Sequence, residues 1–372
     1  MIKIFHTADI HLDSPFRRMA HSERMAARQH QREIFEKMMS YVKENEFDMV
    51  LLSGDLFDTC DPSPEAEECA IKAFASLSCP VIISPGNHDP YLRTPAYFKR
   101  KFPENVYVFS SDEMQIFEFE ELRLQVCGYA FTSSNVYEKN PLRDFVLPEF
   151  DGVSLLCAHA ELDAPLSRSA PISGKDIAER GFAYAALGHV HKFDGIIHEG
   201  DSVIAYCGCP EGRAFDEKDF GGALSVTVEN GKVISAERII FAERRYLCRA
   251  LDISGISDDT ALLERVKEYI AAEGFDTNTA LRLTLTGEVD MSFTPDKNFL
   301  RNGISKLLML AEVEDSSFPR IDTAELESDP TLRGAVYKNL KTELGSDDPQ
   351  VRHIAAQALK TALFAIDRRD IK

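Results

Sequence analysis

The sequence predicts an α/β fold, and three features of its 372 residues indicate this class. In the first 190 residues, short apolar runs alternate with segments of helical periodicity, which is typical of a sheet covered by helices. Two segments, 114–130 and 223–240, alternate apolar and polar residues on either side of a turn, as β-hairpins do. From about residue 246, a strand–helix–strand pattern is followed by two amphipathic helical patterns.

Each element of the first region is expected from a local pattern. Apolar runs predict five strands, at 2–8, 49–53, 81–84, 153–158 and 183–188. Between the first two runs, a helix is expected because apolar residues recur at helical spacing, at Ile34, Phe35, Met38, Met39 and Val42. The second hairpin should turn at Asn230-Gly231, a pair that favours tight turns between strands.

The region after residue 246 has a different pattern. Strands at 247–253 and 280–285 flank a helix at 261–272, which suggests a small α+β module. One further helix is expected near 330–344, and another should begin at Asp348-Pro349, because aspartate caps helices and proline fits the first helical position. Three domains are therefore expected, at 1–245, 246–322 and 323–372.

Composition limits the location and the partners of the protein. No apolar run reaches the roughly 18 residues that a membrane span needs, and the first residues turn polar too soon for a secretory signal, so we expect a cytoplasmic protein without membrane contact. The eight cysteines are scattered singly, as reduced core residues are. The formal net charge of −19 repels nucleic acid at long range, so a phosphate substrate requires a local source of positive charge.

Every expected strand of the first region ends in residues that can bind a metal. In chain order these segments are Asp9-Ile10-His11, Gly54-Asp55, Gly86-Asn87-His88-Asp89, His159 and Gly188-His189-Val190-His191. Ligands of open α/β sheets bind beyond the carboxyl ends of the strands, so these segments should meet. Carboxylate, amide oxygen and imidazole without thiolate suit divalent transition metals. A single such aspartate could cap a helix, but five coincidences at five strand ends favour a metal centre.

This order of motifs resembles the calcineurin-like metallophosphoesterase superfamily over roughly residues 1–245. The resemblance implies a four-layer α/β/β/α sandwich as the catalytic domain. It also implies two divalent metal ions, usually Mn²⁺, with Fe, Zn or Mg as alternatives. The first ion would be held by Asp9, His11, Asp55 and His191. The second would be held by Asp55, which bridges the two, and by Asn87, His159 and His189.

The resemblance also implies a reaction. A hydroxide between the two ions would attack the phosphorus in line, and the ions would clamp the attacking and departing oxygens. Two divalent ions outweigh the charges of Asp9, Asp55 and one hydroxide, so the site would attract phosphate in spite of the acidic chain. His88 would stabilise the transition state or protonate the leaving oxygen. Asp89 could orient His88, and Asp58 could orient a metal ligand.

Two of these motifs narrow the class of substrate. Protein serine/threonine phosphatases of this superfamily read Gly-Asp-x-x-Asp-Arg-Gly and Gly-Asn-His-Glu, whereas this chain has Thr59 after Asp58 and Asp89 after His88. The segment 11–16, together with 54–58, instead resembles the SbcD-type DNA-repair exonucleases, and more closely their bacterial YhaO-like relatives. That branch implies a Mn²⁺-dependent exonuclease and endonuclease acting on DNA with an SbcC-type coiled-coil ATPase.

The same branch implies roles for the remaining segments. Residues 246–320 occupy the position at which such exonucleases carry a capping domain. The C-terminal helices occupy the position of the segment that docks on the ATPase. The family also suggests a homodimer. Arg17, Arg93 and Arg213 could contact flanking phosphates, although ordinary solvated side chains would look the same. Two other functions stay open, a phosphodiesterase for cyclic nucleotides or other small esters and a non-catalytic scaffold. The presence of Asn87 and His88 counts against the scaffold.

Overall fold

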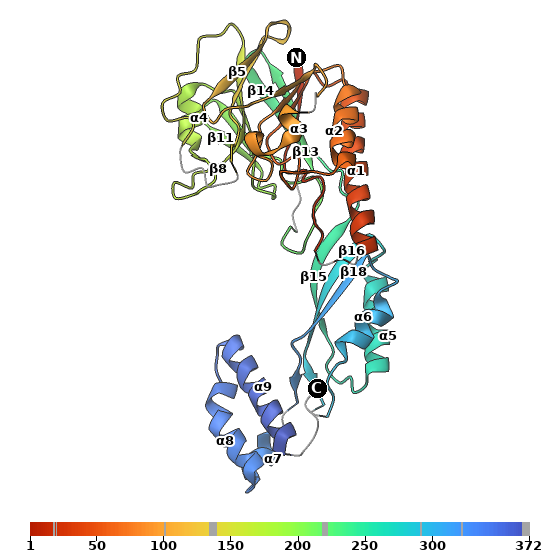
Figure 1. Ribbon diagram of the computed structural model, residues 1–372. Helices are drawn as coiled ribbons and strands as arrows, with labels where there is room; N and C mark the ends of the chain where they lie inside the picture. Colours follow the sequence, from red (N-terminus) through yellow and green to blue (C-terminus); the bar gives the residue numbers. More distant parts are fainter. Residues whose placement is uncertain are drawn as a thin grey trace. The chain divides into compact units, whose positions relative to one another are not determined.

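The protein is described by a computed structural model that covers residues 1–17, 19, 21–99, 102–133, 140–217, 222–290, 292–320 and 323–366. The chain divides into two compact units, Met1–Glu243 and Arg244–Lys372 (Figure 1). The first unit contains two six-stranded sheets and the second a three-stranded sheet with helices. Among the described residues, none of the helices combines the length and the apolar content needed to cross a membrane.

The first sheet carries the N-terminal strand near its centre. Its order is β14 (Lys232–Ile239), β13 (Ala223–Glu229), β1 (Ile2–Thr7), β2 (Met49–Leu52), β3 (Val81–Ile83) and β4 (Val106–Val108). Strands β1 to β4 are parallel, because helical segments return the chain to the same end each time. These segments include α1 (His21–Glu44), α2 (Pro64–Ala75), the 3₁₀ turn η1 (Tyr91–Arg93) and α3 (Pro95–Phe98).

The second sheet has a similar arrangement. Its order is β11 (Ile196–Glu199), β12 (Ser202–Tyr206), β10 (Tyr184–Gly188), β7 (Val153–His159), β6 (Leu124–Gly128) and β5 (Gln115–Phe119). Strands β6, β7, β10 and β12 are parallel. The 3₁₀ turn η2 (Glu120–Leu122) joins β5 to β6, helix α4 (Gly174–Arg180) precedes β10, and β8 (Glu161–Leu162) pairs with β9 (Pro171–Ile172).

The core consists of three apolar layers, because alternate residues of a strand point to opposite faces. Ile4 of β1 packs between the two sheets with Leu155 of β7, whereas the next residue, Phe5, packs outward with Phe35 of α1. Ile177 of α4 lies in the third layer, outside the second sheet. The first unit is therefore a helix–sheet–sheet–helix sandwich, which confirms the fold class that the resemblance implied.

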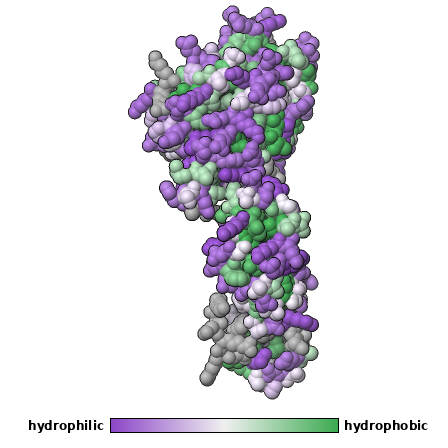
Figure 2. All heavy atoms as spheres, turned by 90° about the vertical axis from the view of Figure 1, so that its right-hand side faces the viewer, coloured by the Kyte–Doolittle hydropathy of each residue, from purple (hydrophilic) through white to green (hydrophobic). Residues whose placement is uncertain are grey.

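The strands expected in the first unit are confirmed to within one or two residues at each end, and so are both hairpins. Strand β5 pairs antiparallel with β6, and β13 pairs with β14. Asn230 and Gly231 both have positive φ, 51° and 83°, as the tight turn requires. In the view of Figure 2, the surface of this unit is mostly hydrophilic, as expected for a chain of net charge −19.

The second unit begins with a parallel three-stranded sheet, in the order β15 (Arg245–Asp252), β16 (Thr279–Thr286) and β18 (Leu310–Asp315). Helices α5 (Asp259–Ala272) and α6 (Lys297–Ile304) share an apolar core with these strands. The pair β17 (Glu288–Val289) and β19 (Phe318–Pro319) is followed by α7 (Thr323–Ser328), α8 (Leu332–Leu344) and α9 (Pro349–Ile366). The helix starting at Pro349 is as expected. The separation of 246–322 from 323–372 stays a prediction.

Candidate metal centre

The predicted ligands lie at the carboxyl ends of both sheets of the first unit. Strands β1, β2 and β3 deliver residues from the first sheet, and β7 and β10 deliver residues from the second. The loop after β1 runs beside the loop after β2, since the backbone N–H groups of Asp9 and His11 donate to Gly54 and Asp55 at 3.0 and 2.9 Å. Asp9, His11 and Asp55 have φ between 51° and 53°, a costly conformation for residues with a side chain.

One group of side chains surrounds a point between the first and the last motif. The Nε2 atoms of His11 and His191 are 3.2 Å apart. Asp55 Oδ2 lies 3.6 Å from His11 Nε2, and Asp9 Oδ1 lies 3.7 Å from His191 Nε2. Asp9, His11 and Asp55 are almost completely buried. The ligand atoms of Asp9, His11 and His191 are close enough together to share one metal ion.

A second group lies on the other side of Asp55. His159 Nε2 is 2.9 Å from Asn87 Oδ1 and 3.5 Å from Asp55 Oδ2. The ring of His189 packs edge-on against that of His159, with centroids 5.1 Å apart. Asp55 Oδ2 is thus within 3.6 Å of an imidazole nitrogen in each group, as a bridging carboxylate would be.

The donor atoms of these groups fit divalent cations. His159 Nδ1 lies 3.0 Å from the carbonyl oxygen of Ser53, and His191 Nδ1 lies 2.7 Å from Glu217 Oε1. Because a carbonyl and a carboxylate accept, both Nδ1 atoms carry a proton, and the Nε2 atom of each ring is left to face the site. These Nε2 atoms lie 2.9 Å from Asn87 Oδ1 and 3.7 Å from Asp9 Oδ1, two oxygens that can only accept. The oxygens of Asn87, Asp9 and Asp55 that face this site repel one another unless a cation lies between them.

Two glycines make room for this arrangement. A Cβ atom on Gly54 would lie 2.2 Å from His159 Nδ1, and one on Gly86 would lie 2.2 Å from Asp55 Oδ1. Gly54 also has a φ of 97°. Any other residue at these positions would displace a ligand, so their glycines are required by close approach as well as by the turn.

Burial shifts the pKa values of several predicted ligands. Burial raises the pKa of Asp9 and lowers the pKa of His11 well below its usual range. The pKa of His189 falls to about 4 for the same reason, with the His159 ring adding to the effect. The lowered pKa values keep His11 and His189 neutral, the state in which an imidazole binds a cation, whereas the raised pKa of Asp9 favours its protonated form unless a cation lies beside it.

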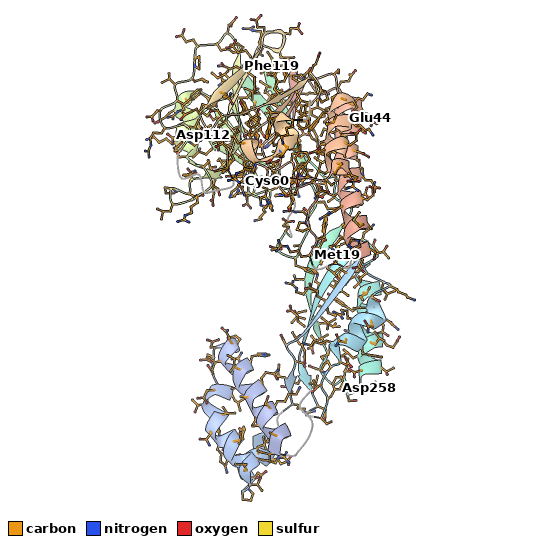
Figure 3. The ribbon with its side chains drawn as sticks, viewed as in Figure 1. Met19, Glu44, Cys60, Asp112, Phe119 and Asp258 are labelled. Atoms are coloured by element: carbon orange, nitrogen blue, oxygen red, sulfur yellow. The ribbon has the colours of Figure 1, made fainter. Side chains whose placement is uncertain are left out.

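His88 lies beside the first group on its accessible side. Its side chain is exposed, and its ring packs edge-on against the ring of His11 at 4.7 Å. Its backbone N–H donates to Asp55 Oδ1 at 3.0 Å, and its ring Nδ1 lies 3.1 Å from the carbonyl oxygen of Asp58. In Figure 3, Cys60, which follows Asp58 in the loop after β2, lies at the opposite side of the first unit from Phe119.

Asp89 and Asp58 differ in how far their contacts match the sequence-based expectation. The buried Asp89 carboxylate accepts hydrogen bonds from the N–H groups of Gly86 and Phe57 and from the hydroxyl of Tyr97. These three bonds fix the loop, and none of them goes to the ring of His88. Burial and the nearby Asp55 raise the pKa of Asp89 to about 7. The Asp58 carboxylate lies 3.1 Å from His11 Nδ1, as expected for a group that orients a ligand.

The three arginines differ in their surroundings. Arg17 and Arg93 are exposed. The Cys60 thiol lies next to the backbone carbonyl of His88. Burial and Asp89 raise the pKa of this thiol, and the charge of Arg93 opposes the rise, so Arg93 also lies near the His88 loop. Arg213 instead pairs with Asp58 and with Glu217 at 3.0 and 2.5 Å. Glu217 was not expected at the site, because no motif in the sequence marks it.

Comparison with known proteins agrees with this geometry. Residues 2–193 match the calcineurin-like phosphoesterase family. Over 281 residues the chain is 27% identical to the uncharacterized metallophosphoesterase YhaO of Bacillus subtilis, covering 72% of this chain and 67% of that protein. It is 22% identical to the SbcD subunit of the SbcCD nuclease of the same organism, covering 76% and 81%.

A third relative comes from an archaeon. The chain is 27% identical to the DNA double-strand break repair protein Mre11 of Saccharolobus solfataricus, covering 57% of this chain and 55% of that protein. The family match covers more than half of the chain, and the two groups of side chains contain ligand atoms for two divalent ions. The chain therefore belongs to the calcineurin-like phosphoesterase family and is a metal-dependent phosphoesterase with a dinuclear site.

Proposed function

We propose that the protein is a Mn²⁺-dependent nuclease that cleaves DNA from its ends and acts in DNA repair in the cytoplasm. The observation that carries this proposal is the likeness to the SbcD subunit of the SbcCD nuclease over 76% of the chain, a larger share than the residues 2–193 of the family match. The similarity thus includes residues beyond the phosphoesterase domain. The likeness to Mre11, a DNA double-strand break repair protein, supports the same substrate.

The metal ligands are proposed from the two groups of side chains. Asp9, His11, Asp55 and His191 hold one ion. Asp55, Asn87, His159 and His189 hold the other. When bound, two such ions lower the pKa of water and stabilise the negative charge that develops on the phosphoryl oxygens.

His88 is proposed as the residue that handles the proton of the leaving oxygen. Its Nδ1 lies 3.1 Å from the Asp58 carbonyl oxygen, which only accepts, so Nδ1 carries the proton of the neutral ring. Nε2 is then the atom that gains a proton and delivers it to the leaving group. Asp89 supports this step by holding the loop 86–89 through the backbone. The exposed Arg17 and Arg93 are proposed to contact flanking phosphates.

A second candidate function is the hydrolysis of small phosphodiesters. It is favoured by the net charge of −19, which opposes approach of a polyanion, and by the ion pairs that occupy Arg213. The same metal centre would serve both reactions.

The two candidates are separated by a paired assay. End-labelled duplex DNA and bis(p-nitrophenyl) phosphate are incubated with the protein and Mn²⁺, and in parallel with Fe²⁺, Zn²⁺ or Mg²⁺. We expect release of labelled nucleotides, fastest with Mn²⁺. Hydrolysis of the small ester alone would reject the nuclease proposal. A protein that binds two ions but hydrolyses neither substrate would favour the non-catalytic scaffold.

The proposed partners are an SbcC-type coiled-coil ATPase and a second copy of this chain. In helix α9, Leu359 and Leu363 are buried against α7 and α8, whereas Val351 and Ile354 are 36% and 61% exposed. Exposed apolar residues on an otherwise packed helix offer a surface for the ATPase. Co-purification of the ATPase should be lost on replacing Ile354 by aspartate, while size-exclusion chromatography reports the dimer. Unchanged co-purification would remove α9 from the proposed interface.

A further inference from the structure

A chain of charged side chains lies behind one half of the metal centre. Arg213 Nη1 is 3.0 Å from Asp58 Oδ1, and it donates to the hydroxyl of Ser14 at 3.1 Å. The other side of the guanidinium binds Glu217, through Nη2 to Oε1 at 2.5 Å and through Nε to Oε2 at 3.2 Å. The backbone N–H of Arg213 also donates to Glu217 Oε2. Arg213 thus pairs with two carboxylates at once.

Each of these carboxylates reaches a different proposed metal ligand. Glu217 Oε1 lies 2.7 Å from His191 Nδ1. Asp58 Oδ1 lies 3.1 Å from His11 Nδ1, close enough for an ion-pair contact although not aligned for a hydrogen bond. Both contacts are on the ring edge that faces away from the Nε2 atoms. The network therefore sets the tautomer of His191 through a hydrogen bond, and it restricts the rotation of the His11 ring through the close contact with Asp58.

The network is largely removed from solvent. The side chains of Arg213, Asp58 and Glu217 are between 12% and 17% exposed. Although burial opposes ionisation, the bonds from His191 and Arg213 outweigh it and lower the pKa of Glu217 to about 2. Bidentate pairs of this kind fix geometry as well as charge, because the guanidinium fork is planar and rigid.

The other half of the centre is supported differently. His159 Nδ1 is held by the carbonyl oxygen of Ser53 at 3.0 Å, and among the described residues no arginine–carboxylate network contacts that ring. A neutral carbonyl raises the basicity of an imidazole less than a carboxylate does. The rings of His191 and His159 therefore differ in the charge placed behind them, a carboxylate for His191 and a neutral carbonyl for His159.

We propose that Arg213 is a positioning residue, which presets His11 and His191 through Asp58 and Glu217 and makes that half of the centre the tighter metal position. This replaces the phosphate contact that the sequence suggested for Arg213. The inference rests on the ligands proposed above, but it does not depend on the substrate being DNA.

Metal binding to the metal-free protein tests this inference directly. Mn²⁺ titrations followed by calorimetry and by electron paramagnetic resonance should resolve two classes of site in the unmodified protein. Arg213→Met and Glu217→Gln should each weaken the tighter class by about 10–100-fold, the usual effect of removing a partner of a metal ligand, and leave the weaker class nearly unchanged. Arg213→Lys should restore part of the loss.

The matched control is Arg180→Met, which breaks a partly buried arginine–aspartate pair in helix α4. It should shift neither class, and thermal unfolding confirms that each variant folds. If Arg213→Met does not fold, the isosteric Glu217→Gln carries the test. Unchanged Mn²⁺ isotherms with a raised KM for bis(p-nitrophenyl) phosphate would make Arg213 a substrate contact and overturn the inference. Because no substrate enters the titrations, failure of the nuclease proposal would leave their result intact.

Discussion

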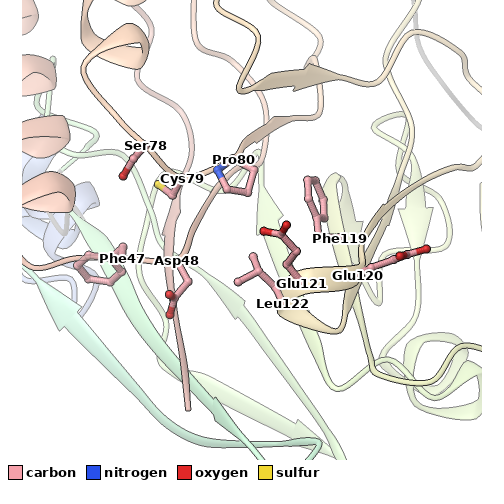
Figure 4. A pocket seen from close by; sticks show the side chains of 9 residues that line it. All are labelled: Phe47, Asp48, Ser78, Cys79, Pro80, Phe119, Glu120, Glu121 and Leu122. Carbon is pink, nitrogen blue, oxygen red and sulfur yellow. The ribbon is translucent and has the colours of Figure 1, made fainter.

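The two ends of the same pair of sheets are built in opposite ways. At the carboxyl end the sheets touch, since the hydroxyl of Ser53 in one donates to Ala186 in the other at 2.9 Å. A Cβ atom on Gly188 would lie 1.9 Å from the Ser53 carbonyl oxygen. At the amino end the chain leaves a cavity of about 440 Å³ (Figure 4). It is lined by Phe47, Asp48, Ser78, Cys79, Pro80, Phe119, Glu120, Glu121 and Leu122.

The difference explains why the chemistry is at one end only. The amino-end cavity contains the carboxylates of Asp48, Glu120 and Glu121, but no imidazole is among its lining residues. At the carboxyl end, close contact brings His159 from one sheet to within 3.5 Å of Asp55 from the other. Acidic residues alone do not form a transition-metal centre, whereas ligands of mixed type brought together by packing do.

The largest expected contrast between the two ends comes from removing one carboxylate at each. Asp55→Ala should lose both ions and reduce hydrolysis of bis(p-nitrophenyl) phosphate to the metal-free background, because Asp55 is proposed to bridge them. Glu120→Ala, at the exposed rim of the amino-end cavity, should leave both properties unchanged. Metal content by mass spectrometry and the hydrolysis rate are measured together. Two bound ions in Asp55→Ala would contradict the bridging role.

Within the carboxyl end, His88 should separate catalysis from metal binding. His88→Ala is expected to keep two ions and to lose about 10²–10⁴-fold in kcat, because the leaving oxygen no longer receives a proton from a positioned group. A substrate with a good leaving group, such as p-nitrophenolate, should lose least. Equal losses for good and poor leaving groups would argue against proton donation by His88.

The contact between the sheets should be sensitive to a single methyl group. Gly188→Ala is expected to destabilise the protein by about 1–3 kcal/mol, since the new Cβ overlaps the backbone of Ser53. Gly174→Ala is the control, because its Cβ would meet its nearest atoms at 3.6 Å. Denaturant unfolding of the two variants is compared. Equal stability would mean that the sheets can move apart at the carboxyl end without loss.

The last comparison concerns an imidazole between the two ends. His6 is buried in β1, its Nδ1 lies 2.8 Å from the Tyr184 hydroxyl, and burial lowers its pKa to about 3. Below pH 6.5 the unfolded chain binds a proton at the His6 imidazole, whereas the folded chain does not bind it until about pH 3. The free energy of unfolding should therefore fall as the pH drops from 6.5 toward 3. The slope is about 1.4 kcal/mol per pH unit from this group.

This slope is measured by denaturant unfolding between about pH 4 and 6.5. His6→Gln should reduce the slope by the contribution of one proton, about 1.4 kcal/mol per pH unit. His198→Gln, at an exposed position of β11, should leave the slope close to that of the unmodified protein. An unchanged slope in His6→Gln would show that His6 is protonated in the folded state.

Local patterns were sufficient for the strands of the first unit and for the types of the candidate ligands. Strand β2 was predicted from its own apolar run, and the turn Gly54-Asp55 from the residues directly after that run. Short-range features of this kind are encoded in adjacent residues. Helix α2 was not predicted from periodicity, although Ser63 before Pro64 is a capping signal that could have indicated it.

The remaining features depend on residues far apart in the chain. Arg213 pairs with Asp58 across 155 positions of sequence, and no local pattern marks such a partner. The bonds of Asp89 to Phe57 and Tyr97 likewise depend on how the loop folds back. A carboxylate in a motif shows that an acceptor is present but not which donor it meets.

The amino-acid sequence by itself determined the strands, the hairpins and the set of candidate metal-binding side chains, because alternation and strand-end motifs are local properties. Only the tertiary structure decided that three of the ligand loops come from one sheet and two from the other, and that Arg213 faces inward. The physical reason is that contacts between two packed sheets depend on side-chain volume at their interface, where Gly188 allows the close approach to Ser53.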